Sequence, residues 1–299
     1  MRIFVTGSTG FIGSRVVSNL LAGGHQVTGL VRSEEAACKL TDAGATAQHG
    51  TLEDPQSWLC AIEHCDAVIH TAFDHDFSRF VANCEKDRRV IAAIGAVLKG
   101  SQRPFIITSG TAMGDDDSGQ PAREQNYNPA HSNPRVASER EGNSLLESGI
   151  DVRVVRLPQV HNTERQGLIS YYIPQAKEKS VAAYINEGQN AWCAAHVDDV
   201  ARLYVKVLEH GESGKRYHAV AEESISSRQI ADAVAAGLGV STASLKPEQA
   251  ADHFGWFAAF ASMDLRASGE WTRQQLNWQP TGPGLLDDLR NMDYSVLAQ

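Results

Sequence analysis

The chain has 299 residues, and its proportions of hydrophobic (42%) and charged (21%) residues are those of a folded globular protein rather than a disordered or coiled-coil one. Its formal net charge of −9 repels phosphate backbones, so we predict no nucleic-acid partner. No stretch approaches the roughly 18 apolar residues of a membrane span, and the first residues run directly into a strand pattern, so we expect a cytoplasmic protein without a membrane partner. Five scattered cysteines and eleven histidines lack the spacing of metal ligands, which predicts free thiols and no metal.

Through the first half of the chain, short β-branched runs alternate with segments of helical periodicity, a pattern typical of βαβ units and a parallel sheet. The predicted strands are Arg2–Thr6, Gln26–Val31, Thr46–His49, Ala67–Thr71, Phe105–Thr108 and Val152–Leu157. The predicted helices are 11–21, Glu35–Ala43, Pro55–Glu63, Phe77–Lys99 and Pro134–Glu147. The fold class is therefore α/β, with a doubly wound parallel sheet of the Rossmann type.

The alternation ends near Arg156, after which aromatic residues become denser and the last quarter is predicted to be mainly helical. A helical segment at Val197–Leu208 and a strand pattern at Tyr217–Val220 are expected to return the chain to the sheet. We therefore predict a Rossmann domain at 1–157, joined by 195–220, and a smaller, mainly carboxy-terminal cap at 158–194 and 221–299.

A glycine-rich turn lies between the first predicted strand and the first predicted helix. Glycines let the backbone turn tightly and approach a pyrophosphate, while the amides and the positive end of the helix dipole face its negative charge. The order of strand, glycine turn and helix therefore predicts a dinucleotide site. Its expected contacts are Thr6, Gly7, Thr9, Gly10, Phe11, Ile12 and Gly13.

The end of the second predicted strand indicates which dinucleotide is preferred. NAD-selective sites usually carry Asp or Glu there to bind the ribose hydroxyls, but this chain has Arg32 and Ser33. A guanidinium can bind a ribose 2′-phosphate bidentately, and Ser33 can add a hydroxyl, so we expect NADP(H) in preference to NAD(H). Thr71, Ala72 and Phe73 end the fourth strand, where ligands bind in such sheets, and are predicted to line the same groove.

Several segments together resemble the extended short-chain dehydrogenase/reductase superfamily, in its epimerase/dehydratase-like branch. They are the glycine turn 6–13, the strand 66–72 (DAVIHTA) and the strand end Thr108-Ser109-Gly110. Members of the superfamily carry Ser or Thr after the fifth strand and Tyr-x-x-x-Lys on the following helix. Here the corresponding stretch reads His131-Ser132-Asn133-Pro134-Arg135, which resembles an atypical subgroup with His-x-x-x-Arg in place of Tyr-x-x-x-Lys.

The resemblance implies roles for individual residues. In the superfamily, the tyrosine protonates a carbonyl oxygen as hydride arrives from the nicotinamide, and the lysine holds the nicotinamide ribose. Here His131 would donate the proton, while Arg135, which does not release a proton near neutral pH, would hold the ribose. Ser109 would be a second donor to the substrate oxygen. Pro158 and Val160, after the sixth strand, would lie beside the nicotinamide carboxamide.

The identity of the proton donor stays open in the sequence. Within a helix, proline is well tolerated only in the first turn, so Pro134 places His131 at or before the start of the helix. Alignment of His131 with Arg135 on one helical face is then not guaranteed. Tyr127, four residues before His131, is the second candidate donor.

These observations predict an NADP(H)-dependent oxidoreductase that reduces the carbonyl of a small aldehyde or ketone. A non-catalytic NADP(H)-binding redox sensor and an epimerase or dehydratase of a sugar nucleotide are the alternatives. The predicted cap has no cluster of basic residues that could bind the diphosphate of a sugar nucleotide. Its aromatic residues could form one wall of a substrate pocket, although aromatic residues in a small cap belong more often to its core. They are Tyr171, Trp192, Phe254 and Trp256. The substrate, the reaction direction, the hydride face and the formation of a homodimer stay open.

Overall fold

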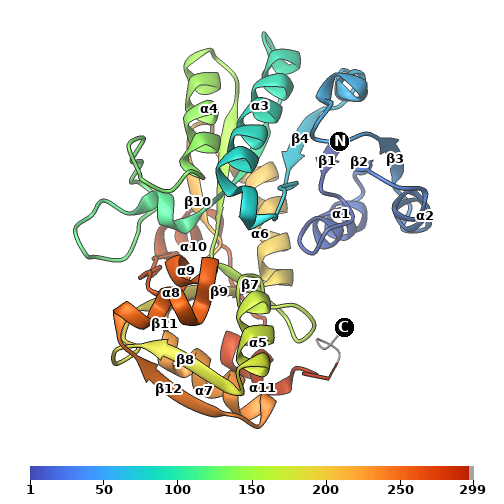
Figure 1. The fold of residues 1–299 in the computed structure, drawn as a ribbon. Coiled ribbons are helices and arrows are strands. Elements are labelled where there is room, and N and C mark those ends of the chain that lie inside the picture. Colours follow the sequence, from blue (N-terminus) through green and yellow to red (C-terminus); the bar gives the residue numbers. More distant parts are fainter. Residues whose placement is uncertain (296–299) are drawn as a thin grey trace.

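The computed structural model describes residues 1–295 and is built around one seven-stranded sheet in which all neighbouring strands are parallel (Figure 1). The strand order is β10-β6-β5-β4-β1-β2-β3. Its strands are β1 (Arg2–Thr6), β2 (Gln26–Val31), β3 (Thr46–His49), β4 (Ala67–His70), β5 (Phe105–Gly110), β6 (Val152–Leu157) and β10 (Arg216–His218). The order reverses between β1 and β4, and doubly wound sheets open a ligand crevice at such a point, outside the carboxyl ends of the strands.

Helices cover both faces of this sheet. They are α1 (Gly13–Ala22), α2 (Glu34–Asp42) and α6 (Val197–His210) on one face, and α3 (Phe80–Leu98) and α4 (Val136–Glu147) on the other. Successive residues of β1 point into different cores, since Ile3 packs with α1 and α6 while Phe4 packs with α3. Burial of both faces explains why the strands are continuous apolar runs in the sequence.

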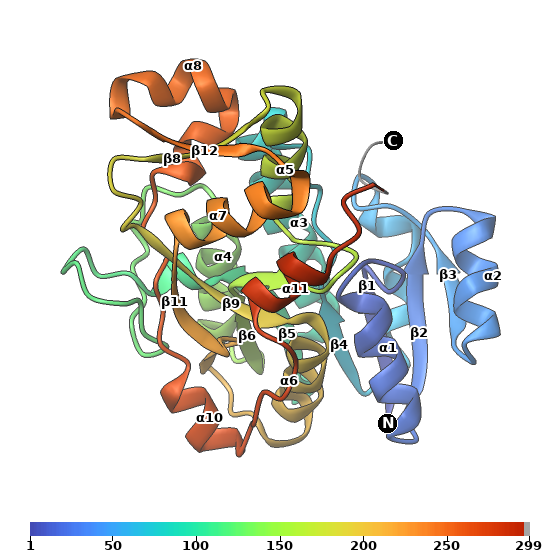
Figure 2. The same ribbon diagram turned by 90° about the horizontal axis from the view of Figure 1, so that it is seen from below.

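A second layer of small sheets and short helices lies beside the parallel sheet (Figures 1 and 2). One sheet has the order β11-β9-β7, and β12 pairs with β8 in another. The elements are β7 (Gln159–His161), α5 (Ile169–Glu178), β8 (Val181–Ile185), β9 (Ala191–His196), β11 (Glu222–Ser226), α7 (Ser227–Leu238), β12 (Ser241–Leu245), α8 (Ala250–Phe254), α9 (Ala258–Ala261) and α11 (Leu285–Asn291). The helix α10 (Glu270–Leu276) lies instead against the main sheet. The second layer has a core of its own, which includes Tyr172, Trp192 and Phe254.

The predicted α/β class and the parallel sheet are confirmed. β1, β2, β3 and β6 have the predicted bounds, β4 ends one residue earlier than predicted, and β5 extends two residues further. The segment 195–220 contributes α6 and β10, and β10 pairs with β6 in the main sheet.

The helix predicted at Pro55–Glu63 is wrong. The segment forms two short 3-10 helices, η1 (Pro55–Ser57) and η2 (Leu59–Ile62), around a completely buried Trp58. The Trp58 ring stacks on Phe4 with 5.5 Å between the ring centroids. The packing of the Trp58 side chain fixes the backbone on either side of it, so two short 3-10 helices form in place of one α-helix.

The last quarter is mainly helical, as predicted, although β12 and the end of β11 are strands within it. Two further details of the structure were not predicted. Because α10 lies against β10 and α6, Leu276 and Trp278 join the core of the main sheet although they fall in the predicted cap range 221–299. The helix predicted from Pro134 begins at Val136.

Within residues 1–295, no helix has both the length and the hydropathy needed to cross a membrane. The same part of the chain holds no group of three or more His, Cys, Asp or Glu placed to bind a metal ion.

Candidate active site at the carboxyl ends of the strands

The turn after β1 has a geometry that requires glycine. Gly7 has a φ of +68°, and a Cβ on Gly13 would lie 2.0 Å from the Gly7 carbonyl oxygen. A Cβ on Gly7 would lie 2.8 Å from the Ala72 nitrogen and 2.8 Å from Thr71 Oγ1. The backbone of the turn therefore packs against the start of α1 and the end of β4 with no room for a side chain between them. This fits the predicted pyrophosphate cradle and brings Thr71 and Ala72 to it.

No side chain caps the start of α1. The Ser14 and Arg15 amides donate to the Gly10 and Ile12 carbonyl oxygens, whereas the Ile12 and Gly13 amides form no hydrogen bond within the described residues and can face an anion. Thr9 is exposed in the turn before Ile12, the N-cap residue. Two guanidinium groups lie over the Phe11 ring, that of Arg15 at 5.2 Å and that of Arg165 at 5.7 Å from the centroid. Sequence reasoning does not single out Arg165, because one arginine in the loop after β7 gives no pattern.

Arg32 directly follows β2, and its side chain is exposed. Its guanidinium has no hydrogen bond or ion pair within the part of the chain that the structure describes. Ser33 is the N-cap of α2, where its Oγ accepts from the Ala36 N–H at 3.2 Å. The Ser33 hydroxyl can still donate its own proton. The two residues therefore present an unpaired cation and a donor at the end of β2.

Arg135 is the N-cap residue of α4 and is held between β5 and α3. Its Nη1 pairs with Asp87 Oδ2 at 2.5 Å, and its Nη2 donates to the Thr108 carbonyl oxygen at 2.8 Å. The guanidinium lies over the Phe73 ring, 4.2 Å from its centroid. Two predicted groove residues, Phe73 and Arg135, are thus in contact next to the end of β5.

A buried chain of polar groups connects this arginine to the glycine turn. His70 places Nε2 3.0 Å from Asp87 Oδ1 and Nδ1 2.7 Å from Thr6 Oγ1. The Ala72 N–H donates to Thr6 Oγ1, so a Thr6 hydroxyl that donates to Nδ1 and a His70 ring protonated on Nε2 satisfy every group. Burial opposes the ionisation of Asp87, but Arg135 and His70 together hold its pKa well below the usual range. Asp87 is therefore an anion that fixes Arg135.

Ser109 and Thr111 are both buried at the end of β5. The Ser109 Oγ forms no hydrogen bond of ordinary geometry within the described residues, whereas Thr111 Oγ1 lies 3.4 Å from Cys193 Sγ. Glu139 of α4 pairs with the buried Arg156 of β6 at 2.8 Å. Against the effect of burial, Arg156 lowers the pKa of Glu139, and Ser109 adds to this shift. The Ser109 hydroxyl thus lies near a carboxylate.

His131 lies in the loop before α4, as the position of Pro134 predicts, and not on a helical face with Arg135. Its Nδ1 accepts a hydrogen bond from the Asn133 N–H at 3.0 Å. A neutral ring must therefore carry its proton on Nε2. No residue of 1–295 provides a hydrogen-bond partner for this Nε2, so it is free to meet a ligand.

Tyr127, the second candidate donor, packs elsewhere. The Arg216 guanidinium lies over its ring, 4.2 Å from the centroid. Burial raises the pKa of Tyr127, which makes its hydroxyl a weaker acid. Of the two candidates, His131 is the one that the structure brings to the cavity described next.

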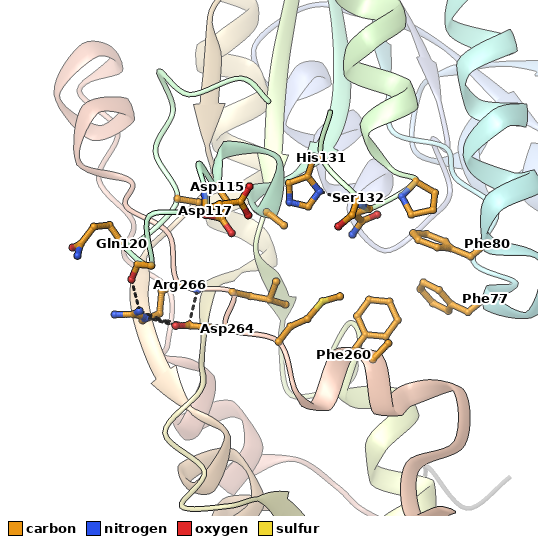
Figure 3. A pocket seen from close by; sticks show the side chains of 18 of the residues that line it. Phe77, Phe80, Asp115, Asp117, Gln120, His131, Ser132, Phe260, Asp264 and Arg266 are labelled. Carbon is orange, nitrogen blue, oxygen red and sulfur yellow. Dashed lines mark hydrogen bonds and ion pairs between the residues drawn. The ribbon is translucent and has the colours of Figure 1, made fainter. Parts of the chain in front are cut away.

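A cavity of about 520 Å³ opens between the loop before α4, the segment before and at the start of α3, and the second layer (Figure 3). His131 lies at its wall together with Ser132, Asn133 and Pro134. Ser109 and Arg135 are not among the described residues that line it. The remaining walls are aromatic (Phe77, Phe80, Trp256, Phe260), acidic or ion-paired (Asp115, Asp117, Asp264, Arg266), and otherwise small, polar or aliphatic (Ala112, Gly119, Gln120, Ala122, Ala259, Met263, Leu265).

Comparison with known proteins decides the family. The model of the NAD dependent epimerase/dehydratase family matches residues 3–221. The chain belongs to this family. It is therefore an NAD(P)-dependent enzyme of the short-chain dehydrogenase/reductase type, with the glycine turn, parallel sheet and cavity described above.

Relatives and solved structures of several kinds resemble this family member. "Uncharacterized protein C2A9.02" of Schizosaccharomyces pombe is 44% identical over 98% of this chain and 100% of the relative. Vestitone reductase of Medicago sativa is 27% identical over 73% of this chain and 76% of the relative. The structure of DesIV, a dTDP-glucose 4,6-dehydratase from Streptomyces venezuelae with NAD and TYD bound, has a TM-score of 0.76 and 20% identity, with 97% of this chain and 96% of that chain covered. This last likeness supports the fold.

The remaining predicted positions of this epimerase/dehydratase-family site lie after β6. Pro158 joins β6 to β7, and Val160 is buried in the core of the main sheet. The Val160 side chain is therefore packed in the protein, and a contact with a dinucleotide would come from its backbone. Of the four aromatic residues considered as a substrate wall, Trp192 and Phe254 are core residues and Trp256 lines the cavity. Tyr171 packs edge-on against Trp256, with 5.4 Å between the ring centroids.

Proposed function

We propose that this enzyme is an NADP(H)-dependent reductase of the carbonyl group of a small aldehyde or ketone, with His131 as the proton donor. The observation that carries the proposal is the free Nε2 of His131 at the wall of a partly aromatic cavity. Relatives whose names describe ketone reduction support it, among them vestitone reductase and the 2-alkyl-3-oxoalkanoate reductase of Shewanella oneidensis.

The residues at the strand ends suit the parts of a phosphorylated dinucleotide. The glycine turn and the uncapped start of α1 would hold the pyrophosphate. The unpaired Arg32 and the Ser33 hydroxyl would bind the 2′-phosphate, which is the basis for proposing NADP(H) rather than NAD(H). Arg135, fixed over Phe73, would hold the nicotinamide ribose. The bound dinucleotide would supply a hydride to the carbonyl carbon.

His131 would complete the reduction at the carbonyl oxygen. In its charged form the ring carries protons on both nitrogens, and the Nε2 proton passes to the oxygen, which leaves an alcohol and a neutral imidazole. Charging the ring costs the hydrogen bond from Asn133, because Nδ1 then becomes a donor. Ser109, whose buried hydroxyl lies near the Glu139 carboxylate, is the proposed second donor to the same oxygen.

Steady-state oxidation of NADPH with a panel of aldehydes and ketones tests the proposal. We expect turnover with at least one carbonyl compound. The His131→Asn variant should lose about two to four orders of magnitude in kcat, the usual contribution of general acid catalysis, with little change in NADPH affinity. Equal kcat values for the two proteins would remove His131 from the mechanism, and tight NADPH binding without any turnover would contradict the reductase assignment.

A further inference from the structure

The charges and rings of the cavity restrict the substrate further than the proposed function does. We propose that the cavity selects aryl carbonyl compounds that carry a positive charge or are neutral, and that it rejects substrates with a carboxylate or phosphate. This specificity rests on the proposed reductase function, because it places the carbonyl group of such a compound at His131.

One wall of the cavity carries acidic side chains. Three carboxylates line this wall, those of Asp115, Asp117 and Asp264. Apart from His131, the basic side chain among the described lining residues is that of Arg266. Arg266 is already neutralised, since its Nε donates to Asp264 Oδ2 at 2.8 Å and its Nη2 to the Gly119 carbonyl oxygen at 3.1 Å. Within residues 1–295 no ion pair balances Asp115 or Asp117. An anionic substrate would therefore meet two unbalanced carboxylates, and His131 is the one lining side chain within the described residues that could offer it an unpaired positive charge.

The opposite wall is aromatic and is built from both layers of the molecule. Phe77, from the segment before α3, stacks on Trp256 of the second layer with 5.1 Å between centroids and 9° between ring planes. Phe260 meets both rings edge-on, at 5.6 Å and 6.0 Å. Trp256 still leaves 44% of its surface exposed, so it can bury further area against a ligand. A flat aromatic body fits this wall.

The positions of the two walls determine which end of the substrate carries the aromatic ring and which end carries the charged group. Figure 3 shows Phe77, Phe80 and Phe260 at one end of the cavity and Asp115 and Asp117 at the other, with His131 between them. An aryl ketone would place its ring against the aromatic end and its carbonyl near His131. A substituent beyond the carbonyl would then face the carboxylates.

Three matched ligands test the proposal through binding, independently of turnover. They are phenyl ketones of one chain length that end in an ammonium, a hydroxyl or a carboxylate group beyond the carbonyl. Calorimetric titration of the NADP⁺-loaded enzyme should give the lowest Kd for the ammonium ketone. The Kd of the carboxylate ketone should be at least about tenfold higher, as expected for partly screened charges near a protein surface. The gap should narrow as the ionic strength rises.

Two variants separate the contributions of the walls. In Asp115→Asn/Asp117→Asn, the charge preference should collapse to less than about threefold, while the Kd of the hydroxyl ketone stays unchanged. In Trp256→Leu, all three ligands should weaken by a similar factor. NADP⁺ affinity should equal that of the unmodified enzyme in both variants, which controls for folding.

The outcomes distinguish this proposal from the reductase assignment. Equal or tighter binding of the carboxylate ketone, or no binding of any of the three at millimolar concentration, overturns the proposed specificity. The predicted ranking without turnover supports the specificity but contradicts the reductase function. Turnover without the ranking supports the reductase and overturns the specificity.

Discussion

His131 and Arg135 have different surroundings, which suit the different roles proposed for them. His131 exposes Nε2 to the cavity while Asn133 holds Nδ1, whereas Arg135 is bound by Asp87 and covers Phe73. The spacing of the two residues made them candidates in the sequence. Asp87 gave no such signal, because it lies 48 residues from Arg135 and meets it only when α3 and α4 pack together.

The proposed preference for NADP(H) depends mainly on one residue, Arg32. Replacing it by Asp places a carboxylate where a 2′-phosphate would bind, so we expect Arg32→Asp to raise the KM for NADPH. A charge-assisted bidentate contact is typically worth about 1.5–3 kcal/mol, which corresponds to a factor of roughly 10 to 150. The KM for NADH should fall or stay constant. Steady-state kinetics with both dinucleotides measure this, and unchanged discrimination would refute the NADP(H) preference.

At the scale of elements, the sequence predicted strands correctly where burial on both faces determines the structure. The strands of the parallel sheet are covered on both faces, so β-branched runs locate them closely. The prediction failed at 55–63, where the packing of Trp58 on Phe4 overrides local helical periodicity. It also missed β11 and β12, whose residues are partly exposed and carry little hydrophobic pattern.

Asp87 of α3 and Arg135 at the start of α4 form an ion pair between the two helices. Asp87→Asn removes the charge that balances a mostly buried guanidinium, so the free energy of unfolding should fall by about 3–5 kcal/mol. NADPH affinity should also fall, because Arg135 loses its fixed position. Urea unfolding and NADPH titration measure the two effects.

A matched control for this variant is Ser138→Ala. The Ser138 hydroxyl donates to the same carboxylate at 2.6 Å and accepts from Arg135 Nη1, but it carries no charge. Its removal should cost only about 0.5–1.5 kcal/mol. If Asp87→Asn is no more harmful than Ser138→Ala, the carboxylate does not hold Arg135 in the way described.

At the scale of the whole molecule, the site lies where segments distant in the sequence meet. The cavity is lined from 77–80, 112–134 and 256–266, and its aromatic wall joins both layers. A sequence shows which residues can do chemistry at strand ends, since the parallel sheet gathers those ends. It does not show which cap residues face them. Trp256 and Phe254 are two positions apart, yet one lines the cavity and the other is core.

The stability of the molecule should depend on pH through His218, which is fully buried next to Arg156. Burial, together with the charge of Arg156, lowers the pKa of His218 to about 3. An unfolded histidine titrates near ~6.5, so between these values the unfolded state binds more protons. The unfolding free energy should therefore fall as the pH drops from about 6.5 towards 3, by at most about 1.4 kcal/mol per unit from this residue.

Urea unfolding at several pH values across this window measures the slope. The His218→Gln variant lacks the titrating ring and should show a shallower dependence than the unmodified protein. Identical slopes in the two proteins would mean that His218 does not contribute to acid instability.

Transfer of isotope from cofactor to substrate tests the central claim most directly. The enzyme is incubated with an aryl ketone and NADPH that carries deuterium at C4 of the nicotinamide, with each of the two C4 positions labelled in separate experiments. We predict one deuterium on the carbinol carbon of the alcohol with one of the two labelled forms, and a large loss of this product in His131→Asn. Saturation of the enzyme with NADPH, without deuterium in any product from either form, would contradict the account.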